Sequence, residues 1–274
     1  MNKFIKFLIF ILISLACSTA VYAKNLKFVQ VTDVHLSSDG STLSHRDVSH
    51  SVQGLKDAVN SINKLSDIDF VVFSGDNIDA SNEKDLMVFC EITKNLKKPY
   101  YILIGNHDAY KLCGISKKTY INIVKQYDKY QKSNNAYFYF FPTSKFIVII
   151  MDGATPIIPS THGYFPDEQV DWLDNILTKY KNKKAIIIQH FPLIPPFNNK
   201  SHEVLEPEKY MEVLTKHKNI LAILSGHYHK EKVMYDNDIY HISSPALIEY
   251  PAKYRVIEID SKFNLQTELI QLDR

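Results

Sequence analysis

Five short polar motifs in this chain carry side chains that could hold metal ions, and each motif follows an apolar run. The motifs are, in chain order, Asp33-Val34-His35, Gly75-Asp76, Gly105-Asn106-His107-Asp108, Gln189-His190 and Gly226-His227-Tyr228-His229. The apolar runs before them are residues 28–31, 70–73, 101–104, 185–188 and 221–224. Such runs are typical of strands buried on both faces. Because the carboxyl ends of these strands meet at one crevice, we expect the motifs to lie together.

The donor types in these motifs indicate a pair of divalent metal ions. The candidate ligands offer oxygen and nitrogen but no thiolate, and they are Asp33, His35, Asp76, Asn106, His190, His227 and His229. Mixed imidazole and carboxylate ligands suit Mn, Fe or Zn rather than a cysteine-rich structural zinc site. Seven ligands can form two four-ligand sites if one carboxylate bridges, as in paired hydrolytic metals. Two dications with two carboxylates stay positively charged, which favours a small anionic phosphoester as substrate.

Each motif also has a structural interpretation when it is taken alone. Asp-x-His is common at strand ends, and Gly-Asp is more often a turn than a ligand. Gly-Asn tolerates unusual backbone angles and can simply form a turn, while a lone histidine such as His190 is more often a core residue. Gly-His-x-His is more specific, because imidazoles at i and i+2 project to the same side of an extended segment. The metal prediction therefore depends on all five motifs occurring after strands.

In this order, the five motifs resemble those of the calcineurin-like metallophosphoesterase superfamily, and the resemblance spans residues 26–260. Within it the chain is most similar to the bacterial cyclic-nucleotide phosphodiesterase-like branch. The residues that favour this branch are Asp167-Glu168-Gln169 with Trp172-Leu173, and Tyr254-Arg255-Val256-Ile257-Glu258. The resemblance implies an α/β fold, a four-layer αββα sandwich in which two mixed β-sheets are flanked by helices.

The resemblance also implies a role for each motif residue. One metal would be held by Asp33, His35, Asp76 and His229. The other would be held by Asp76, Asn106, His190 and His227, so that Asp76 bridges. His107 would donate a proton or stabilise charge at the scissile oxygen, and Asp108 would orient its imidazole. The implied reaction is attack of a hydroxide held between the metals on a phosphodiester or phosphomonoester, nucleotides included.

Two other classes of function are compatible with parts of the sequence. A non-catalytic binding protein could keep this fold, although such proteins usually lose the proton-donating histidine or the ligands, and this chain has the full set. A metal-dependent amidase or peptidase is disfavoured, because no His-Glu-x-x-His helix is present. The leading prediction is thus a metal-dependent phosphoesterase.

The first 23 residues have the layout of a secretory signal peptide. Lys3 and Lys6 precede an apolar core over residues 7–16, and Val21-Tyr22-Ala23 gives a small-residue cleavage site. Residues 24–274 would then form a single metallophosphoesterase domain in the periplasm or outside the cell, with no stable membrane span. Lipid anchoring at Cys17 is the alternative interpretation.

Removal of the signal leaves 30 basic and 30 acidic residues. With no excess of basic residues, the composition gives no indication that the chain binds a nucleic-acid polymer or an anionic membrane. Of the remaining cysteines, Cys90 and Cys113 could form a disulfide after export, but their spacing leaves the pairing open. The oligomeric state is also left open.

Strands and helical patterns alternate along the chain, as expected for βαβ units. We expect helices over residues 49–65, 83–96, 119–130, 167–180 and 206–217, and a further strand over residues 146–151. The tail alternates as antiparallel strands do, over residues 232–235, 239–242, 254–259 and 265–272. The loops 37–50, 154–165 and 191–203 should shape the substrate pocket, but no loop residue is assigned a role.

Overall fold

The computed structural model describes residues 25–42 and 45–273, which form two β-sheets with flanking helices. The expected signal segment and its Cys17 lie outside the described residues. Within the described ranges, no helix combines the length and the apolar character needed to cross a membrane. All five motifs fall inside the described part of the chain, so their arrangement can be examined directly.

The first sheet contains the strands that precede the first three motifs. Its members are Leu26–Val31 (β1), Phe70–Ser74 (β2), Tyr100–Leu103 (β3), Lys253–Ile259 (β12) and Leu265–Gln271 (β13). The strand order is β13-β12-β1-β2-β3. Strands β1, β2 and β3 run parallel, so their carboxyl ends share one rim, while β12 pairs antiparallel with β1 and β13.

The second sheet contains the strands that precede the last two motifs. Its members are Phe138–Phe140 (β4), Phe146–Ile150 (β5), Lys184–Ile188 (β7), Ile220–Ser225 (β9), Lys232–Asp236 (β10) and Ile239–Ser243 (β11). The order is β10-β11-β9-β7-β5-β4, and β5, β7, β9 and β11 run parallel. A small separate ribbon pairs Gly163–Tyr164 (β6) with Val204–Leu205 (β8).

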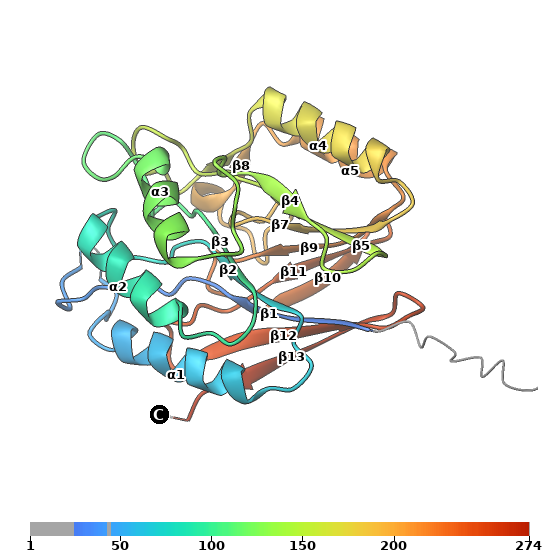
Figure 1. Cartoon of the computed structure of the whole chain (residues 1–274). Coiled ribbons are helices and arrows are strands. Elements are labelled where there is room, and N and C mark those ends of the chain that lie inside the picture. The colour runs from blue at the N-terminus through green and yellow to red at the C-terminus, as the bar shows by residue number, and fades with distance from the viewer. Residues whose placement is uncertain (1–24, 43–44, 274) are drawn as a thin grey trace, which may run out of the picture.

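The helices cover the outer faces of the two sheets, which gives four layers (Figure 1). They are Ser51–Lys64 (α1), Glu83–Thr93 (α2), Lys117–Tyr127 (α3), Asp167–Lys179 (α4) and Glu208–Lys216 (α5). In α1 the buried apolar residues recur at helical spacing, as Leu55, Ala58, Val59 and Ile62. Helices α1 to α3 lie on the side of the first sheet, and α4 and α5 lie on the side of the second.

The central strands are apolar on both faces, which explains why their sequences read as continuous apolar runs. In β2, Phe70 and Val72 belong to the cluster between the two sheets, whereas Val71 and Phe73 belong to the cluster that packs against helices. The same period of two divides β5 and β7. If one of these strands shifted by one residue along its neighbour, each of its side chains would move to the opposite face of the sheet. Packing on both faces therefore fixes the register of the strand.

Near the rim that carries the motifs, the space between the sheets becomes polar. Gln30 continues the inner face of β1, and its Nε2 donates to Ser74 Oγ at 2.9 Å and to the carbonyl of Ser225 at 3.1 Å. Ser244 Oγ donates to Gln30 Oε1 at 2.8 Å, and the buried Arg255 donates to Ser244. Because buried polar groups are costly when they lack partners, this network fixes the two sheets against each other beneath the rim.

The predicted sandwich is confirmed, and every predicted helix and strand is present with ends that differ by a few residues. One expectation was wrong: β11 was grouped with the antiparallel tail, but it pairs parallel with β9 and antiparallel only with β10. The strands β4, β6 and β8 were not expected, because segments of two or three residues are too short to display a period. Cys90 is buried, Cys113 is exposed, and neither forms a disulfide with the other.

Candidate dimetal site

Unusual backbone angles bring the motif side chains together at the rim. Left-handed φ angles are uncommon for residues other than glycine and cost about 1–3 kcal/mol each. Five of the seven candidate ligands have them, namely Asp33 (53°), His35 (44°), Asp76 (51°), His227 (70°) and His229 (54°). Gly75, directly before Asp76, has a φ of 95°. The surrounding contacts must hold these turns, and such concentrated strain is characteristic of functional sites.

The first half-site consists of Asp33, His35 and His229, whose side-chain donors lie within 4.8 Å of one another. The Nε2 atom of His229 is 3.3 Å from Asp33 Oδ1 and 3.3 Å from His35 Nε2. Asp33 also accepts hydrogen bonds from the hydroxyl of Thr32 and from the backbone N–H of His227. These three ligands come from both sheets and converge on one point.

The second half-site contains His190 and His227, and Asn106, which directly precedes His107, is the further ligand expected for it. His190 and His227 form a second group of donors together with Asp76, again within 4.8 Å of one another. Two buried atoms here, Asn106 Oδ1 and His190 Nε2, make no hydrogen bond to any described residue. A buried polar atom without a partner costs about 1–3 kcal/mol. Both atoms are the ones expected to bind a metal, so the residues present fit a second ion.

Asp76 lies between the two half-sites. Its Oδ2 atom is 3.6 Å from His35 Nε2 and 3.3 Å from His190 Nε2. Its other oxygen, Oδ1, accepts a hydrogen bond of 2.9 Å from the backbone N–H of His107, which fixes the rotation of the carboxylate. One oxygen thus faces ligands of both half-sites, as a bridging carboxylate requires.

The imidazoles of the second half-site are braced by backbone carbonyls. His190 Nδ1 is 2.9 Å from the carbonyl oxygen of Ser74, and His227 Nε2 is 2.8 Å from that of Thr161. A metal-binding histidine usually donates its second ring N–H in this way, which sets the tautomer. His190 is therefore left with Nε2, and His227 with Nδ1, as the nitrogen available to a metal.

The imidazoles of the first half-site are braced by charged side chains instead. His229 Nδ1 is 3.0 Å from Glu249 Oε1. His35 Nδ1 is 3.4 Å from Asp79 Oδ1 and 3.2 Å from Arg46 Nη1, and Arg46 forms a 2.9 Å ion pair with Asp79. Both histidines turn Nε2 toward the centre. In each of the four imidazoles, one ring nitrogen is thus held by a bracing group and the other is left to bind a metal.

Comparison with known proteins agrees with this geometry. Residues 26–231 match the calcineurin-like phosphoesterase family. The chain belongs to that family. It is 26% identical over 208 residues to the probable glycerophosphodiester phosphodiesterase GpdQ of Arcobacter nitrofigilis, covering 74% of this chain and 71% of that protein. It is 24% identical over 266 residues to the 3′,5′-cyclic adenosine monophosphate phosphodiesterase CpdA of Haemophilus influenzae, covering 91% of each.

Among solved structures, a dimetal phosphatase from Danio rerio shares the fold with a TM-score of 0.68 and 18% identity, covering 90% of this chain and 99% of that one. The family prediction is thereby confirmed. The calcineurin-like phosphoesterase described here is a metal-dependent hydrolase of phosphoric esters with a dimetal site for divalent ions.

Before a metal binds, charge in this phosphoesterase is divided between close carboxylates and imidazoles. Burial opposes ionisation of Asp76, but His190 and His107 lower its pKa well below the usual range. Burial likewise opposes ionisation of Asp33, yet His229 and His190 lower its pKa. Burial depresses the pKa of His190 and His229, but the carboxylates raise each pKa to about 9. Without a bound metal, the imidazoles of His190 and His229 are therefore protonated at pH 7 and carry the positive charge beside the two carboxylates.

The other two imidazoles stay neutral at physiological pH. Burial is the largest cause, and it lowers the pKa of His35 to about 4 and that of His227 to about 3. Each half-site therefore contains one protonated and one neutral imidazole when no metal is bound. The neutral member can ligate at once, whereas the protonated member must first release its proton.

His107 lies beside the first half-site, but its imidazole does not contact the partner expected from the sequence. Its ring lies edge-on to His35 at 4.7 Å between centroids, and its Nδ1 is 2.7 Å from the backbone carbonyl of Asp79. Asp108, which was expected to orient this imidazole, instead accepts hydrogen bonds from the backbone N–H groups of Gly105, Asn77 and Ile78. That expectation needs correction, because the buried Asp108 joins the loops after β2 and β3.

The sequence did not identify the groups that brace the site imidazoles. In the structure these groups belong to Asp79, Glu249, Arg46 and Thr161. Arg46 lies in the loop 37–50, where a role was left open. Thr161 contributes only its carbonyl, which carries no side-chain signal. Of these residues, only Asp79 could have been found from the local sequence, because it lies three residues after Asp76. An acidic residue close to one metal ligand often forms a hydrogen bond with another ligand.

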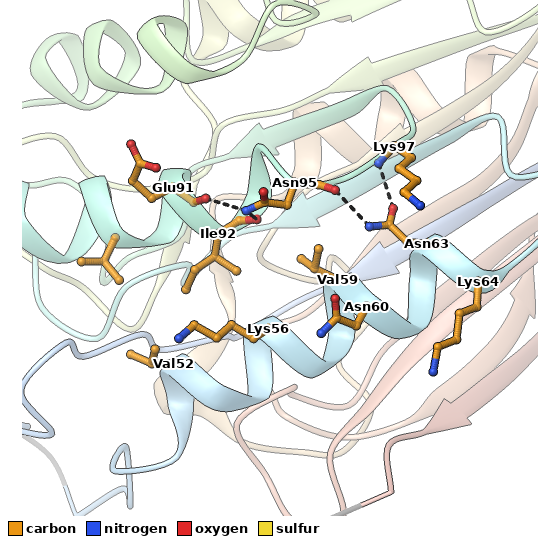
Figure 2. Close-up of a pocket in the computed structure, with 11 residues that line it drawn as sticks. Val52, Lys56, Val59, Asn60, Asn63, Lys64, Glu91, Ile92, Asn95 and Lys97 are labelled. Carbon is orange, nitrogen blue, oxygen red and sulfur yellow. Dashed lines mark hydrogen bonds between the residues drawn. The ribbon is translucent and has the colours of Figure 1, made fainter.

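One hollow on the surface of this phosphoesterase lies away from these ligands. It has a volume of about 930 Å³ and runs between α1 and α2 (Figure 2). Lys56 and Asn60 line it from α1, Glu91 lines it from α2, and Asn95 lies just after α2, where its carbonyl accepts a hydrogen bond from the side chain of Asn63. None of the candidate ligands lines it. The dimetal site is thus recognised by its chemistry rather than by the size of its cavity.

Proposed function

We propose that this phosphoesterase is exported and hydrolyses small phosphodiesters or phosphomonoesters, nucleotides among them, with two ions of Mn, Fe or Zn. The observation that carries the proposal is the position of Asp76, one oxygen of which faces both half-sites. Two relatives with diesterase names, one for glycerophosphodiesters and one for a cyclic nucleotide, support a diester. Nitrogen and oxygen donors without thiolate support these borderline metals.

The chain's own residues have distinct parts in this reaction. When bound, the two ions would supply positive charge at the phosphoryl group and would lower the pKa of water. Asp33, His35 and His229 would hold one ion, Asn106, His190 and His227 would hold the other, and Asp76 would bind both.

His107 has a different part, because its Nδ1 is engaged by the carbonyl of Asp79. Its Nε2 is the nitrogen left to reach substrate, where it would donate a proton to the departing oxygen. Such assistance is typically worth about 10²–10⁴-fold in rate.

The export proposal is supported by the charge, apolar core and small-residue ending of the first 23 residues. An exported enzyme would act on phosphoesters outside the cytoplasm. Mass spectrometry of the protein made in a bacterial host would locate the start. We expect it near Lys24. An intact Met1 in the soluble cytoplasmic fraction would contradict export, and a lipid on Cys17 would favour the anchored alternative.

The activity proposal is tested with purified protein and Mn, Fe, Zn or Mg against bis-nitrophenyl phosphate, nitrophenyl phosphate and cyclic nucleotides. His107→Ala serves as the decisive variant. It should keep both metals but lose more rate on a cyclic nucleotide than on a nitrophenyl ester, because an alkoxide needs a proton to leave and a nitrophenolate does not. Equal losses would remove the acid role, reduced metal content would make His107 a ligand, and no hydrolysis with any metal would refute the proposed function.

A further inference from the structure

A second hollow, smaller than the one between α1 and α2, adjoins the first half-site. Its volume is about 510 Å³, which lies within the range of small-molecule sites. Two segments form it, residues 45–50 and residues 248–250, the latter after β11. The lining residues that matter are His45, Arg46, His50, Ile248, Glu249 and Tyr250. We call it the side hollow.

The inner wall of the side hollow is made of the groups that brace the first half-site. Arg46 Nη1 is 3.2 Å from His35 Nδ1, and Glu249 Oε1 is 3.0 Å from His229 Nδ1. The side hollow is therefore separated from the expected metal position by one layer of imidazoles. A substrate whose phosphoryl group sits on the metals could place its substituent there.

The outer wall carries flat rings that do not contribute to the core. Tyr250 is 79% exposed, and among the described residues its ring packs against no other ring. His45 and His50 are also exposed. A tyrosine is the largest apolar group in the hollow, and leaving it in water has no benefit for folding. An unpartnered ring at the mouth of a site is suited to stacking on a planar ligand.

We propose that the side hollow binds the nucleobase of a nucleotide substrate, with the Tyr250 ring stacked on the base while the phosphoryl group lies at the dimetal site. This proposal rests on the proposed function and specifies its substrate class. Ile248 adds an apolar contact, and the ribose spans the distance between the base and the phosphoryl group. A glycerol-type alcohol would gain no stacking, so the hollow would favour nucleotides over other diesters.

Kinetics on two diesters test the preference. Tyr250→Ala should raise KM for 3′,5′-cyclic AMP about tenfold, since the variant loses the stacking contact between an aromatic side chain and the base. Its kinetics on glycerophosphoethanolamine should not change, because that diester has no ring. Tyr250→Phe keeps the stacking face and should behave as the unmodified protein. Tyr235→Ala is the matched control, since Tyr235 is an exposed tyrosine on β10 outside the hollow.

A binding measurement separates this proposal from the proposed function. Calorimetry of the Mn-loaded protein with AMP and with glycerol 3-phosphate requires no turnover. We expect AMP to bind more weakly to Tyr250→Ala and equally to Tyr250→Phe, with glycerol 3-phosphate unaffected. If Tyr250→Ala does not fold, Tyr250→Leu, which keeps bulk but has no ring, should show the same loss. Equal AMP binding in all variants, or no AMP binding by the unmodified protein, would overturn the proposal.

Discussion

The two half-sites hold similar ligands but are braced by different parts of the molecule. In the second half-site the imidazoles of His190 and His227 form hydrogen bonds with backbone carbonyls, those of Ser74 and Thr161 respectively. His190 is completely buried. In the first half-site, His229 is paired with the carboxylate of Glu249, whose side chain is 56% exposed. A carbonyl is fixed by the strand or loop that carries it, whereas an exposed side chain can move. The imidazoles of the second half-site are therefore held by the backbone, whereas the His229 side of the first half-site is open to adjustment by substitution or by ligands.

The strongest challenge to this comparison is to remove the residue that both half-sites share. Asp76→Asn should lose more metal than Asn106→Ala, which removes a ligand from the second half-site alone. The reason is that the seven ligands complete two four-ligand sets only through a shared carboxylate. Elemental analysis of both purified variants measures the effect. Two full equivalents of metal in Asp76→Asn would rule out the bridge.

Two glycines allow each half-site to be damaged separately. A Cβ at Gly75 would lie 2.6 Å from His190 Nδ1 at a φ of 95°, so Gly75→Ala should empty the second half-site. A Cβ at Gly226 would lie 2.4 Å from Asp33 Oδ2, so Gly226→Ala should empty the first. Metal content should fall by about one equivalent in each.

Gly40→Ala is the control for the backbone cost of such changes. Gly40 has a φ of 75°, but a Cβ there would come no closer than 3.9 Å to Ser49 Cα. Gly40→Ala should lower the melting temperature, because alanine is strained at positive φ, but it should not reduce the metal content. If Gly75→Ala and Gly226→Ala lost the same ion, the division into two half-sites would be incorrect.

A milder change tests the difference in bracing itself. Glu249→Gln removes the charge that holds His229, so the ion of the first half-site should bind about 10–100-fold more weakly. The other ion should be unaffected, because its imidazoles rest on carbonyls. Competition with a chelator would resolve the two affinities, and Glu268→Gln, at an exposed position of β13, is the control. Equal weakening of both ions would show that bracing does not distinguish them.

The smallest expected effect is the release of protons on metal binding, and here the two half-sites should behave alike. His190 and His229 each have a pKa of about 9 without metal, so both carry a proton at pH 7 that a metal must displace. Loading should release about two protons at pH 7, and affinity should increase with pH until about pH 9. Calorimetry in buffers of different ionisation enthalpy counts the protons. Release near zero would mean that the raised pKa values do not govern binding.

The sequence predicted what depends on local pattern. The runs before the motifs gave the strands, and the parallel order brought all seven candidate ligands to one rim. The bracing groups were missed because they depend on distant parts of the chain meeting, as Glu249 meets His229 and Thr161 meets His227. The role of Asp108 was wrong for the same reason, since its partners include Asn77, on another loop.

The candidate ligands come from both sheets, with Asp33, His35, Asp76 and Asn106 following strands of the first and His190, His227 and His229 following strands of the second. An ion bound at either half-site would act as a cross-link between the two layers. Separation of the layers would require its release, so resistance to heat and proteases would increase with free metal concentration. A cell compartment poor in metal would leave the enzyme both inactive and easier to degrade.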